Sequence, residues 1–232
     1  MKMKIIHVLC EGQTEQGFVN NVLKPYLIAK GIAAVKSVLV CTSRKANACG
    51  GLVSFPKVEN DLNIMMKSDE DNDSERHIFT TMFDLYALPG DFPAYADAQH
   101  IIDRYERVAA MEKAFSDSIG SDRFIPYIQL HEFEALVLCG LDFLKKMYVG
   151  CDKQIEQLKS ELYKVGNPEL VNDGPDTAPS KRIIKAIEGG KKKLYSYDKP
   201  KSGKYVTQNV GIDKLCEQCR HFNEWVGKLL SV

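Results

Sequence analysis

The chain has 232 residues, of which 44% are hydrophobic and 27% are charged, so it can bury a sizeable core and has the composition of a globular protein. Its 31 Lys and Arg residues balance its 31 Asp and Glu residues, which excludes a strongly basic protein and limits any nucleic-acid surface to a local patch. The first apolar run, residues 5–10, is too short for a secretion signal, and no stretch approaches the roughly 20 apolar residues of a membrane-spanning helix. We therefore expect a cytoplasmic protein that makes no membrane contact and keeps its cysteines reduced.

The first half of the chain predicts strands that alternate with helices. Residues 4–10 (KIIHVLC) form a short apolar run typical of a central strand, and a helix follows to about residue 30, with Thr14 as its expected N-cap. Residues 34–41, 77–86 and 123–130 predict further strands, and residues 52–67 and 96–119 predict the helices between them. This order predicts an α/β fold that has a mostly parallel central sheet with helices on both faces.

The character of the sequence changes after residue 150. Residues 151–165, 180–188 and 215–230 predict helices, whereas residues 189–204 form a basic stretch rich in turn residues. We therefore divide the chain into an α/β core, residues 1–150, and a mainly helical extension, residues 151–232. The extension is expected to pack on the core and to contribute to its site.

Acidic side chains follow three of the predicted strands. Glu11 comes after the first strand, Asp84 lies at the end of the third, and Glu132 and Glu134 follow the fourth. Ligands of an open α/β sheet bind beyond the carboxyl ends of its strands, and carboxylates brought together there favour a bound Mg²⁺ or Mn²⁺. The alternative is that each acid lies in a solvated loop.

Two segments predict contacts to phosphate. Gly12 allows a tight turn after Glu11, so that the amides at the start of the helix near Thr14 can receive a phosphate. Ser180 is expected to cap a later helix, and Lys181 and Arg182 place two cations at the N-terminus of that helix, against its dipole. A phosphate contact explains this arrangement; a solvated basic turn is the alternative.

A basic stretch with interleaved aromatic residues predicts a nucleic-acid contact. Lysines, including Lys192 and Lys204, alternate with Tyr195, Tyr197 and Tyr205, which combines backbone charge contact with faces for base stacking. A solubilising surface is the alternative interpretation.

The histidines and cysteines give weaker signals. His7 lies inside an apolar strand, which favours a satisfied core residue, whereas His131 adjoins Glu132 and is a candidate to orient a carboxylate or carry a proton. Cys216 and Cys219 form a lone CxxC on a predicted helix, and without a second pair we interpret them as structural.

Four separated motifs carry a family resemblance. They are CEGQTE at residues 10–15, TTMFDLYALP at 80–89, IPYIQLHEFEAL at 125–136 and APSKR at 178–182. In this order they resemble a bacterial family of unknown function that is related to Toprim domains and includes RloG-like phage-resistance proteins, often encoded beside an ATPase. The resemblance runs nearly from end to end of the chain.

The resemblance implies a Toprim-like, Rossmannoid core in which a glutamate and an Asp-x-Asp motif hold Mg²⁺. Glu11 and Asp84 match the first two ligands, but Tyr86 stands where the second aspartate is expected. Glu132 or Glu134 can replace that ligand, and Lys181 resembles the late lysine of the nuclease branch. On a strand the two glutamates share a face; on a helix they diverge by about 200°, and only one points inward.

Three functions agree with these sequence features. The first is a metal-dependent nuclease of an anti-phage defence system, acting on DNA or RNA through Glu11, Asp84, Glu132 or Glu134, and Lys181. The second is a non-catalytic regulatory or nucleic-acid-binding partner of an ATPase, with a degenerate site. The third is a phosphotransfer or nucleotide-hydrolysing enzyme that uses the same acids. Assembly into a homo-oligomer is left open.

Overall fold

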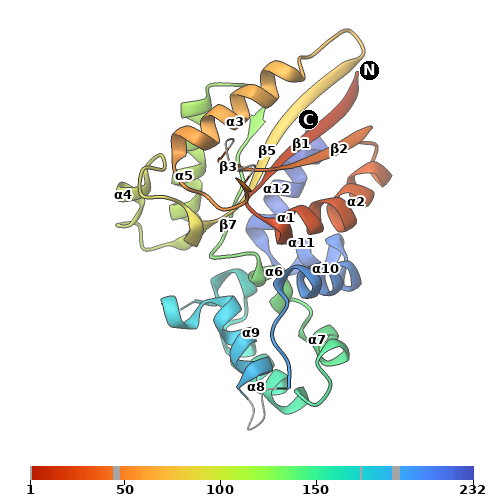
Figure 1. The fold of residues 1–232 in the computed structure, drawn as a ribbon, viewed down its shortest axis with the longest axis vertical. Coiled ribbons are helices and arrows are strands. Elements are labelled where there is room, and N and C mark those ends of the chain that lie inside the picture. The colour runs from red at the N-terminus through yellow and green to blue at the C-terminus, as the bar shows by residue number, and fades with distance from the viewer. Residues whose placement is uncertain (1, 44–47, 173, 190–193) are drawn as a thin grey trace.

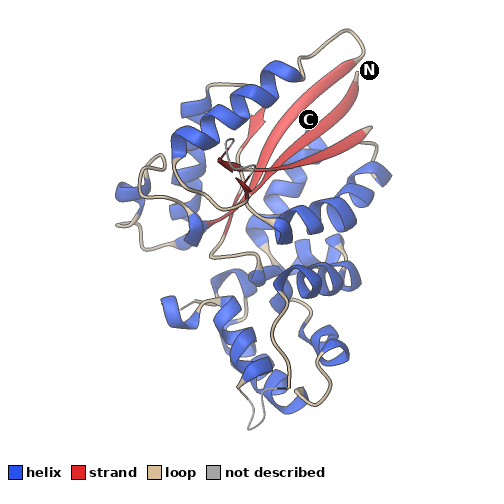
Figure 2. Ribbon diagram, viewed as in Figure 1, coloured by secondary structure: helices blue, strands red, loops and turns tan. Residues whose placement is uncertain are grey.

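The computed structural model describes residues 2–43, 48–172, 174–189 and 194–232 (Figure 1). Its centre is a parallel sheet of five strands in the order β2-β1-β5-β6, and β7 continues beside the end of β5. These strands are β1 (Met3–Cys10), β2 (Ala34–Leu39), β5 (Glu75–Asp84), β6 (Phe124–Ile125) and β7 (Ile128–Gln129). Helices surround the sheet (Figure 2), so the predicted α/β fold with a parallel sheet is confirmed.

The two central strands are apolar on both sides, which is why their sequence lacks an alternating pattern. Leu9 and Phe83 pack into the core on one face of the sheet, while Val8 and Met82 pack into the core on the opposite face. Each central strand therefore contributes to two separate cores, and a helical layer closes each of them.

The first face is covered by α3 (Phe55–Ser68) and α5 (Arg104–Ile119). Phe115 of α5 is the centre of an aromatic cluster, because its ring lies 4.8 to 6.3 Å from the rings of Phe55, Phe83, Phe92 and Phe124. The short helices η2 (Leu85–Ala87) and α4 (Tyr95–Ala98) lead from the end of β5 to this layer. A fully buried aromatic cluster of this size contributes several kcal/mol to stability, on the order of 2 kcal/mol for each ring.

The second face is covered by helices from both ends of the sequence. After β1 come α1 (Gln13–Phe18), the π-helical segment η1 (Val19–Leu23) and α2 (Lys24–Ala29), and they are joined by α11 (Ile212–Gln218) and α12 (Arg220–Ser231). Trp225 of α12 stacks on Tyr127 at 4.1 Å and donates a 2.8 Å hydrogen bond from Nε1 to Thr80 Oγ1 in β5. The last helix is therefore part of the sheet's core.

The lower half of the molecule is helical (Figure 2). It contains α6 (Glu134–Leu138), α7 (Leu141–Met147), α8 (Asp152–Val165), α9 (Pro179–Glu188) and the short helices η3 (Pro168–Leu170) and η4 (Pro175–Thr177). The chain then returns toward the sheet through α10 (Lys199–Val210), which packs between α1, α6 and α7. Within the described ranges, no helix is both long and apolar enough to span a membrane.

Several element boundaries differ from the sequence-based predictions, each for a local reason. The predicted strand at 123–130 divides into β6 and β7, because Pro126 lies between them and has no N–H for the ladder. The strand predicted at 34–41 ends at Leu39, and a small hairpin follows, made of β3 (Cys41–Ser43) and β4 (Ala48–Cys49). The end of the predicted basic stretch is helical, since Asp198 caps α10 by accepting a 3.0 Å hydrogen bond from Lys201 N–H.

Candidate metal centre

The ends of the two central strands hold the first two predicted acids together. Glu11 directly follows β1, and Asp84 is the last residue of β5. The pairing of these strands sets Cys10 opposite Met82, and the backbone N–H of Asp84 donates a 3.0 Å hydrogen bond to Glu11 Oε2. Glu11 returns a bond through its own N–H to Met82 O at 3.2 Å. Both acids therefore lie at the carboxyl edge of the sheet, as the sequence predicted.

Glu15 joins this site, although it was not among the predicted ligands. It lies in α1, one helical turn after Glu11, and only 6% of its surface is exposed. A Cβ atom added at Gly12 would lie 3.1 Å from Glu15 Oε2, so a glycine there leaves room for the carboxylate. The chain turns from β1 to α1 within two residues, Glu11 and Gly12, as predicted. Gly12 has an extended backbone (φ −145°) that any residue can adopt, and Gly12 rather than Thr14 is the N-cap of α1.

Glu132 and Glu134 approach the same site from the start of α6. Glu132 precedes the helix and accepts two hydrogen bonds from Ser180, at 2.5 Å from its N–H and 3.0 Å from its Oγ–H. Glu134 is the first residue of α6, with 1% of its surface exposed. Because only Glu134 is helical, the alternatives of a shared strand face and diverging helical positions both fail. Both glutamates lie beside one lysine.

That lysine is Lys199, at the start of α10. Its Nζ lies 3.4 Å from Glu134 Oε1 and 3.8 Å from Glu132 Oε2. The close approach of α10 requires Gly203, where a Cβ atom would lie 2.7 Å from the ring of Phe133. Sequence reasoning placed Lys199 in a basic loop; the Asp198-Lys199-Pro200 order was the available signal that a helix starts there.

We call Glu11, Glu15, Asp84, Glu132, Glu134 and Lys199 the acidic centre. Among the residues that the structure describes, Lys199 is the one cation within 4.0 Å of any of its five carboxylates. Five carboxylates and one ammonium leave a formal charge of −4 if all are ionised. Such a concentration of negative charge in a buried site requires bound protons or a bound cation.

The pKa values of the acidic centre reflect this crowding. Burial raises the pKa of Glu11 to about 7, against the lowering effect of the hydrogen bond from Asp84 N–H. Burial likewise raises the pKa of Glu134 to about 7, although Lys199 lowers it. The pKa values of Asp84 and Glu15 are also raised, in both cases chiefly by burial. A divalent cation would favour the ionised form of every one of these groups.

The donor set fits a hard divalent cation. All five acidic side chains offer carboxylate oxygens, the ligands that Mg²⁺ and Mn²⁺ prefer. Asp84 Oδ1 is buried and accepts no hydrogen bond from any described part of the chain, which leaves it open to a ligand. Asp84 and Glu134, which each have a buried carboxylate oxygen without a hydrogen-bond partner among the described residues, and the neighbouring Glu11 are the candidates to hold such an ion. Among the described residues, no three of the five carboxylates have their oxygens within 4.8 Å of one another.

A second cluster of potential ligands lies nearer the N-terminal ends of the same strands. Among the described residues, His7, Asp69 and His77 form the one group of three whose ligand atoms all lie within 4.8 Å of one another. These atoms are already paired: His7 Nε2 lies 2.9 Å from His77 Nδ1, and Lys36 Nζ lies 2.8 Å from Asp69 Oδ1. Burial, with a smaller effect of nearby Lys36, lowers the pKa of His7 to about 4, against the raising effect of Asp69. We interpret this cluster as structural, with His7 as a satisfied core histidine.

His131 does not orient a carboxylate as predicted. Its ring is buried, neither ring nitrogen has a hydrogen-bond partner within the described residues, and it lies 5.3 Å from the ring of Tyr86. Its backbone is left-handed (φ 66°), which turns the side chain away from the neighbouring Glu132 toward Tyr86. Burial, followed by the nearby charge of Arg104, lowers the pKa of His131 to about 4, so the ring is neutral at neutral pH.

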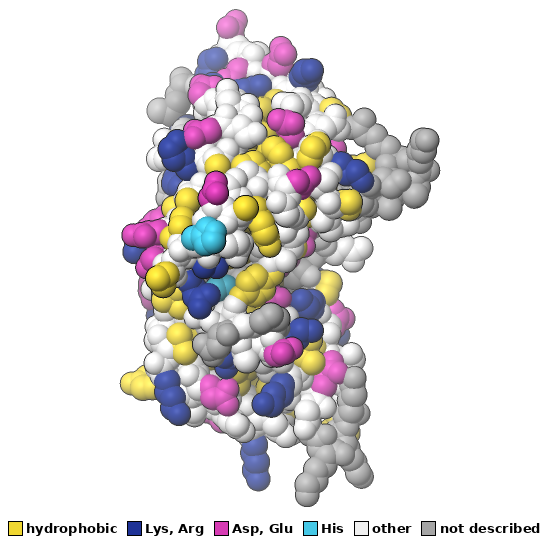
Figure 3. All heavy atoms as spheres, turned by 90° about the vertical axis from the view of Figure 1, so that its left-hand side faces the viewer, with side chains coloured by type: hydrophobic (Ala, Val, Ile, Leu, Met, Phe, Trp, Pro, Cys, Tyr) yellow, Lys and Arg dark blue, Asp and Glu magenta, His cyan; other side chains and the backbone are white. Residues whose placement is uncertain are grey.

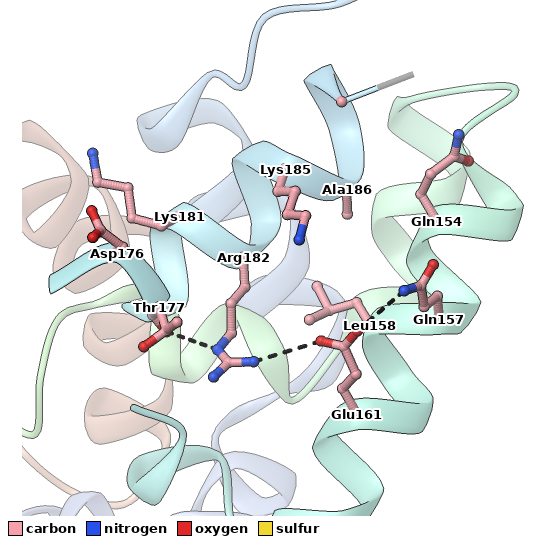
Figure 4. Close-up of a pocket in the computed structure, with 11 residues that line it drawn as sticks. Gln154, Gln157, Leu158, Glu161, Asp176, Thr177, Lys181, Arg182, Lys185 and Ala186 are labelled. Carbon is pink, nitrogen blue, oxygen red and sulfur yellow. Dashed lines mark hydrogen bonds and ion pairs between the residues drawn. The ribbon is translucent and has the colours of Figure 1, made fainter. Parts of the chain in front are cut away.

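The cations predicted at the start of α9 have separate surroundings (Figure 4). Arg182 donates to Thr177 O at 2.7 Å and lies 3.6 Å from Glu161, so it ties α9 to α8 instead of facing the acidic centre. The Lys181 side chain points away from Arg182, and Lys181 lines a cavity that also borders Glu132. Ala178, and not Ser180, is the N-cap of α9; Ser180 lies in the first turn of the helix, where it bonds to Glu132.

The predicted basic and aromatic contact is only partly described. Lys192 lies outside the described residues, and Lys204 is exposed on α10. The tyrosines are not displayed for base stacking: Tyr197 is buried, and Tyr195 and Tyr205 pack against the core. Tyr148 contacts the rings of Tyr195 and Tyr197.

The lone CxxC, Cys216 and Cys219, is not a disulfide. The sulfur of Cys219 lies 3.4 Å from the sulfur of Cys139, and both residues are free thiols.

The fold and this site define an α/β protein with a buried acidic centre at the carboxyl edge of a parallel sheet. Residues 10–230 match the model of a family described as a domain of unknown function (DUF4276), and the chain belongs to that family. No curated protein and no solved structure matches it. The match includes every residue of the acidic centre, from Glu11 to Lys199.

Proposed function

We propose that the protein is a divalent-metal-dependent nuclease that hydrolyses phosphodiester bonds of DNA or RNA. The observation that carries this proposal is the gathering of five carboxylates, from the ends of β1 and β5 and the starts of α1 and α6, with the ammonium of Lys199 beside Glu132 and Glu134. Parallel α/β sheets bind their ligands at this edge, and buried clusters of carboxylates with raised pKa values are typical of functional sites.

The residues of the acidic centre divide into three roles. Glu11, Asp84 and Glu134 would hold Mg²⁺ or Mn²⁺, while Ser180 fixes Glu132 through two hydrogen bonds. When bound, the ion supplies an activated water and stabilises charge on the departing phosphate oxygen. Lys199 balances the carboxylates and offers a positive charge to a phosphate that enters the centre.

The wider setting of this activity rests on the sequence resemblance. The motifs around Glu11 and Asp84 resemble Toprim-related proteins, which include RloG-like phage-resistance proteins often encoded beside an ATPase. We therefore propose a role in bacterial anti-phage defence, inside the cytoplasm, with an ATPase as partner. Tyr86 replaces the second aspartate of that resemblance, and Glu134 takes its place as a ligand.

The test is cleavage of supercoiled plasmid, single-stranded DNA and single-stranded RNA by the purified protein in Mg²⁺ or Mn²⁺. Glu11→Gln and Asp84→Asn preserve side-chain volume and remove one charge each, and we expect each to lower the cleavage rate roughly a hundredfold. Glu217→Gln is the matched control, because Glu217 is exposed on α11 and its ion pair among the described residues is with neighbouring Lys214.

Cleavage that survives chelation by EDTA, or that Glu11→Gln and Asp84→Asn leave at the wild-type rate, would contradict the proposal. Because all variants are purified in the same way, a contaminating nuclease would also produce equal rates in every sample. The Glu217→Gln control shows whether losing one carboxylate elsewhere affects the rate.

A second candidate is a non-catalytic partner of an ATPase that binds nucleic acid through a degenerate site. Two observations favour it: Tyr86 stands in the position of an expected ligand, and the carboxylates of the acidic centre are spaced more widely than the atoms of the His7 cluster. This candidate predicts no heat of Mn²⁺ binding at millimolar concentration by calorimetry. A binding signal that Glu11→Gln abolishes would favour the nuclease.

A further inference from the structure

A small cavity beside the acidic centre is lined by positive and aromatic side chains. It measures about 190 Å³, and its walls include Tyr86, Arg104, Arg107 and His131. We call this cavity, which these four residues line, the anion cavity. They come from three different segments: η2 after β5, the start of α5, and the turn before α6.

The two arginines of the anion cavity have no acidic partner among the residues that the structure describes. Backbone carbonyls hold their guanidinium groups instead: Arg104 donates to Asn172 O at 3.1 Å, and Arg107 donates to Ile101 O at 2.7 Å. These bonds fix the orientation of both groups but do not neutralise either charge. Two fixed, uncompensated arginines next to a cavity are the arrangement that binds phosphate oxygens.

His131 gives independent evidence for a ligand. Only 1% of its surface is exposed, it lines the same cavity, and neither of its ring nitrogens has a partner within the described chain. A buried imidazole normally has its ring nitrogens satisfied. Its left-handed backbone (φ 66°) is also an uncommon conformation for histidine, and the fold maintains it here. A bound anion would accept the missing hydrogen bond from the ring N–H.

The anion cavity continues into a larger one that reaches the acidic centre. This second cavity measures about 420 Å³ and shares Tyr86 and Arg107 with the first. Its remaining walls include Glu132, Lys181 and the ring of Tyr95. Figure 3 shows this side of the molecule, where Lys and Arg side chains gather with histidine and hydrophobic side chains at mid-height. Tyr86 as a whole residue is 46% exposed, so it is accessible to a ligand in this cavity.

We propose that the anion cavity binds a phosphate group of the nucleic-acid strand next to the one that enters the acidic centre. Arg104, Arg107 and the His131 ring N–H contact the phosphate oxygens, and the adjoining nucleotide lies against Tyr86 in the larger cavity. This inference rests on the proposed nuclease function. It specifies the substrate as an unpaired strand, because a paired base cannot enter the cavity. The phosphate is either the terminal one of a strand or an internal one.

The test measures binding without metal, so that it does not depend on cleavage. Single-stranded DNA and RNA oligonucleotides of one sequence, labelled at the 3′ end, are prepared with and without a 5′-phosphate and titrated in EDTA by fluorescence anisotropy. We expect Arg104→Gln and Arg107→Gln each to weaken binding roughly tenfold to a hundredfold, the usual effect of losing a hydrogen bond to a charged group. Inorganic phosphate at millimolar concentration should compete with wild-type protein and fail to compete with these variants.

The matched control is Lys113→Gln, which removes one positive charge from the exposed face of the same helix, α5. It should change affinity by no more than about threefold, the effect of one screened surface charge. Weakening that is confined to the 5′-phosphorylated oligonucleotides supports a terminal phosphate, and equal weakening on both supports an internal one. Arginine variants that bind both oligonucleotides as tightly as Lys113→Gln does would overturn the proposal.

Because Arg104 and Arg107 also hold backbone carbonyls, their variants are first checked by thermal unfolding. His131→Asn provides a second route, since asparagine tolerates the left-handed backbone and leaves both arginine contacts intact. Its expected effect is a severalfold loss of affinity for the same oligonucleotides. If the wild-type protein binds as proposed in EDTA but cleaves nothing in Mg²⁺, the nuclease function is refuted and the phosphate site is retained. If the protein cleaves nucleic acid but the three variants bind as tightly as wild type, the phosphate site is refuted and the nuclease function is retained.

Discussion

The backbone N–H of Asp84 donates a 3.0 Å hydrogen bond to the carboxylate of Glu11, across two neighbouring parallel strands. One potential metal ligand is thus oriented by the backbone of another. This bond keeps Glu11 at the edge of the sheet even though neighbouring carboxylates repel it. It also leaves the side chain of Asp84 unconstrained by Glu11, with its Oδ1 open.

Glu11→Gln should stabilise the protein at neutral pH. The pKa of Glu11 is about 7 in the folded state against an ordinary 4.5, so the folded state binds more protons between these values, and stability falls as pH rises from 4.5 through 7. Glutamine keeps an oxygen acceptor for Asp84 N–H and does not ionise. Urea unfolding should show a gain of about 1–3 kcal/mol at pH 8 and almost none at pH 4.5. A gain that is equal at both pH values would contradict this explanation.

Mg²⁺ or Mn²⁺ should raise the unfolding temperature of the wild-type protein. An ion whose concentration is a hundred times its dissociation constant raises the free energy of unfolding by about 2.7 kcal/mol, provided that it binds only the folded state. Asp84→Asn should abolish this shift, and Glu217→Gln should retain it. Differential scanning fluorimetry with a metal titration measures both. A shift of equal size in wild type and Asp84→Asn would place the metal elsewhere.

Lys199→Gln should destabilise the protein in a pH-dependent way, because it leaves the acidic centre without its positive charge. Loss of the two contacts to Glu132 and Glu134 is expected to cost about 1–2 kcal/mol at pH 8. The cost should shrink toward pH 5, where Glu134, with a pKa of about 7, is protonated. Lys201→Gln, an exposed position on the same helix, is the control and should be nearly neutral. Equal costs for both lysines would show that Lys199 is an ordinary surface residue.

The buried histidines should make the protein sensitive to acid. The pKa of His7 is lowered to about 4 from 6.5, so the unfolded state binds more protons between these values, and stability declines as pH falls from 6.5 through 4. For His7 alone the loss is on the order of 3 kcal/mol, and His131 acts in the same direction. His7→Asn should flatten this decline in urea unfolding, whereas His100→Asn, at an exposed position, should leave it unchanged.

Gly203→Ala tests the close packing that brings α10 to the acidic centre. The new methyl group would lie 2.7 Å from Phe133 and 3.1 Å from Thr14, so we expect a loss of about 1–3 kcal/mol of stability and weaker metal binding. Gly227→Ala is the matched control, because Gly227 is also helical and nothing lies within 4 Å of its added Cβ. That change should stabilise α12 by up to about 1 kcal/mol. Opposite signs for the two substitutions are the expected result.

Local sequence patterns were sufficient to predict the sheet and most helices. The runs at β1 and β5 are long and apolar, so neither their type nor their order was ambiguous. The predictions from these patterns were wrong where a single residue starts or interrupts an element against the propensity of the surrounding segment. Pro126 divides the predicted fourth strand, and Asp198 starts a helix inside a stretch whose composition indicates turns.

The candidate site could be predicted only in part. Glu11 and Asp84 were found because strand ends share an edge, which is a local rule. Lys199 and Arg104 were missed because helix packing between segments far apart in the sequence brings Lys199 to the acidic centre and Arg104 to the anion cavity. His131 was selected for its neighbour Glu132, but its left-handed backbone sends the ring toward Tyr86. The spacing of residues in the sequence does not predict that the side chain of His131 turns away from Glu132.

The hydrogen bond from Trp225 to Thr80 joins residues 145 positions apart and closes one face of the sheet. Contacts of such long sequence separation form slowly, because a large loop must be ordered before they stabilise anything. During synthesis, the strands that carry Glu11 and Asp84 therefore emerge long before the helix that covers them. The acidic centre is completed only when α10 has been made, and this face of the sheet is covered only when α12 follows. We therefore expect that the nascent chain keeps this apolar face exposed until α12 has emerged, and that its proposed activity is absent until α10 has been made.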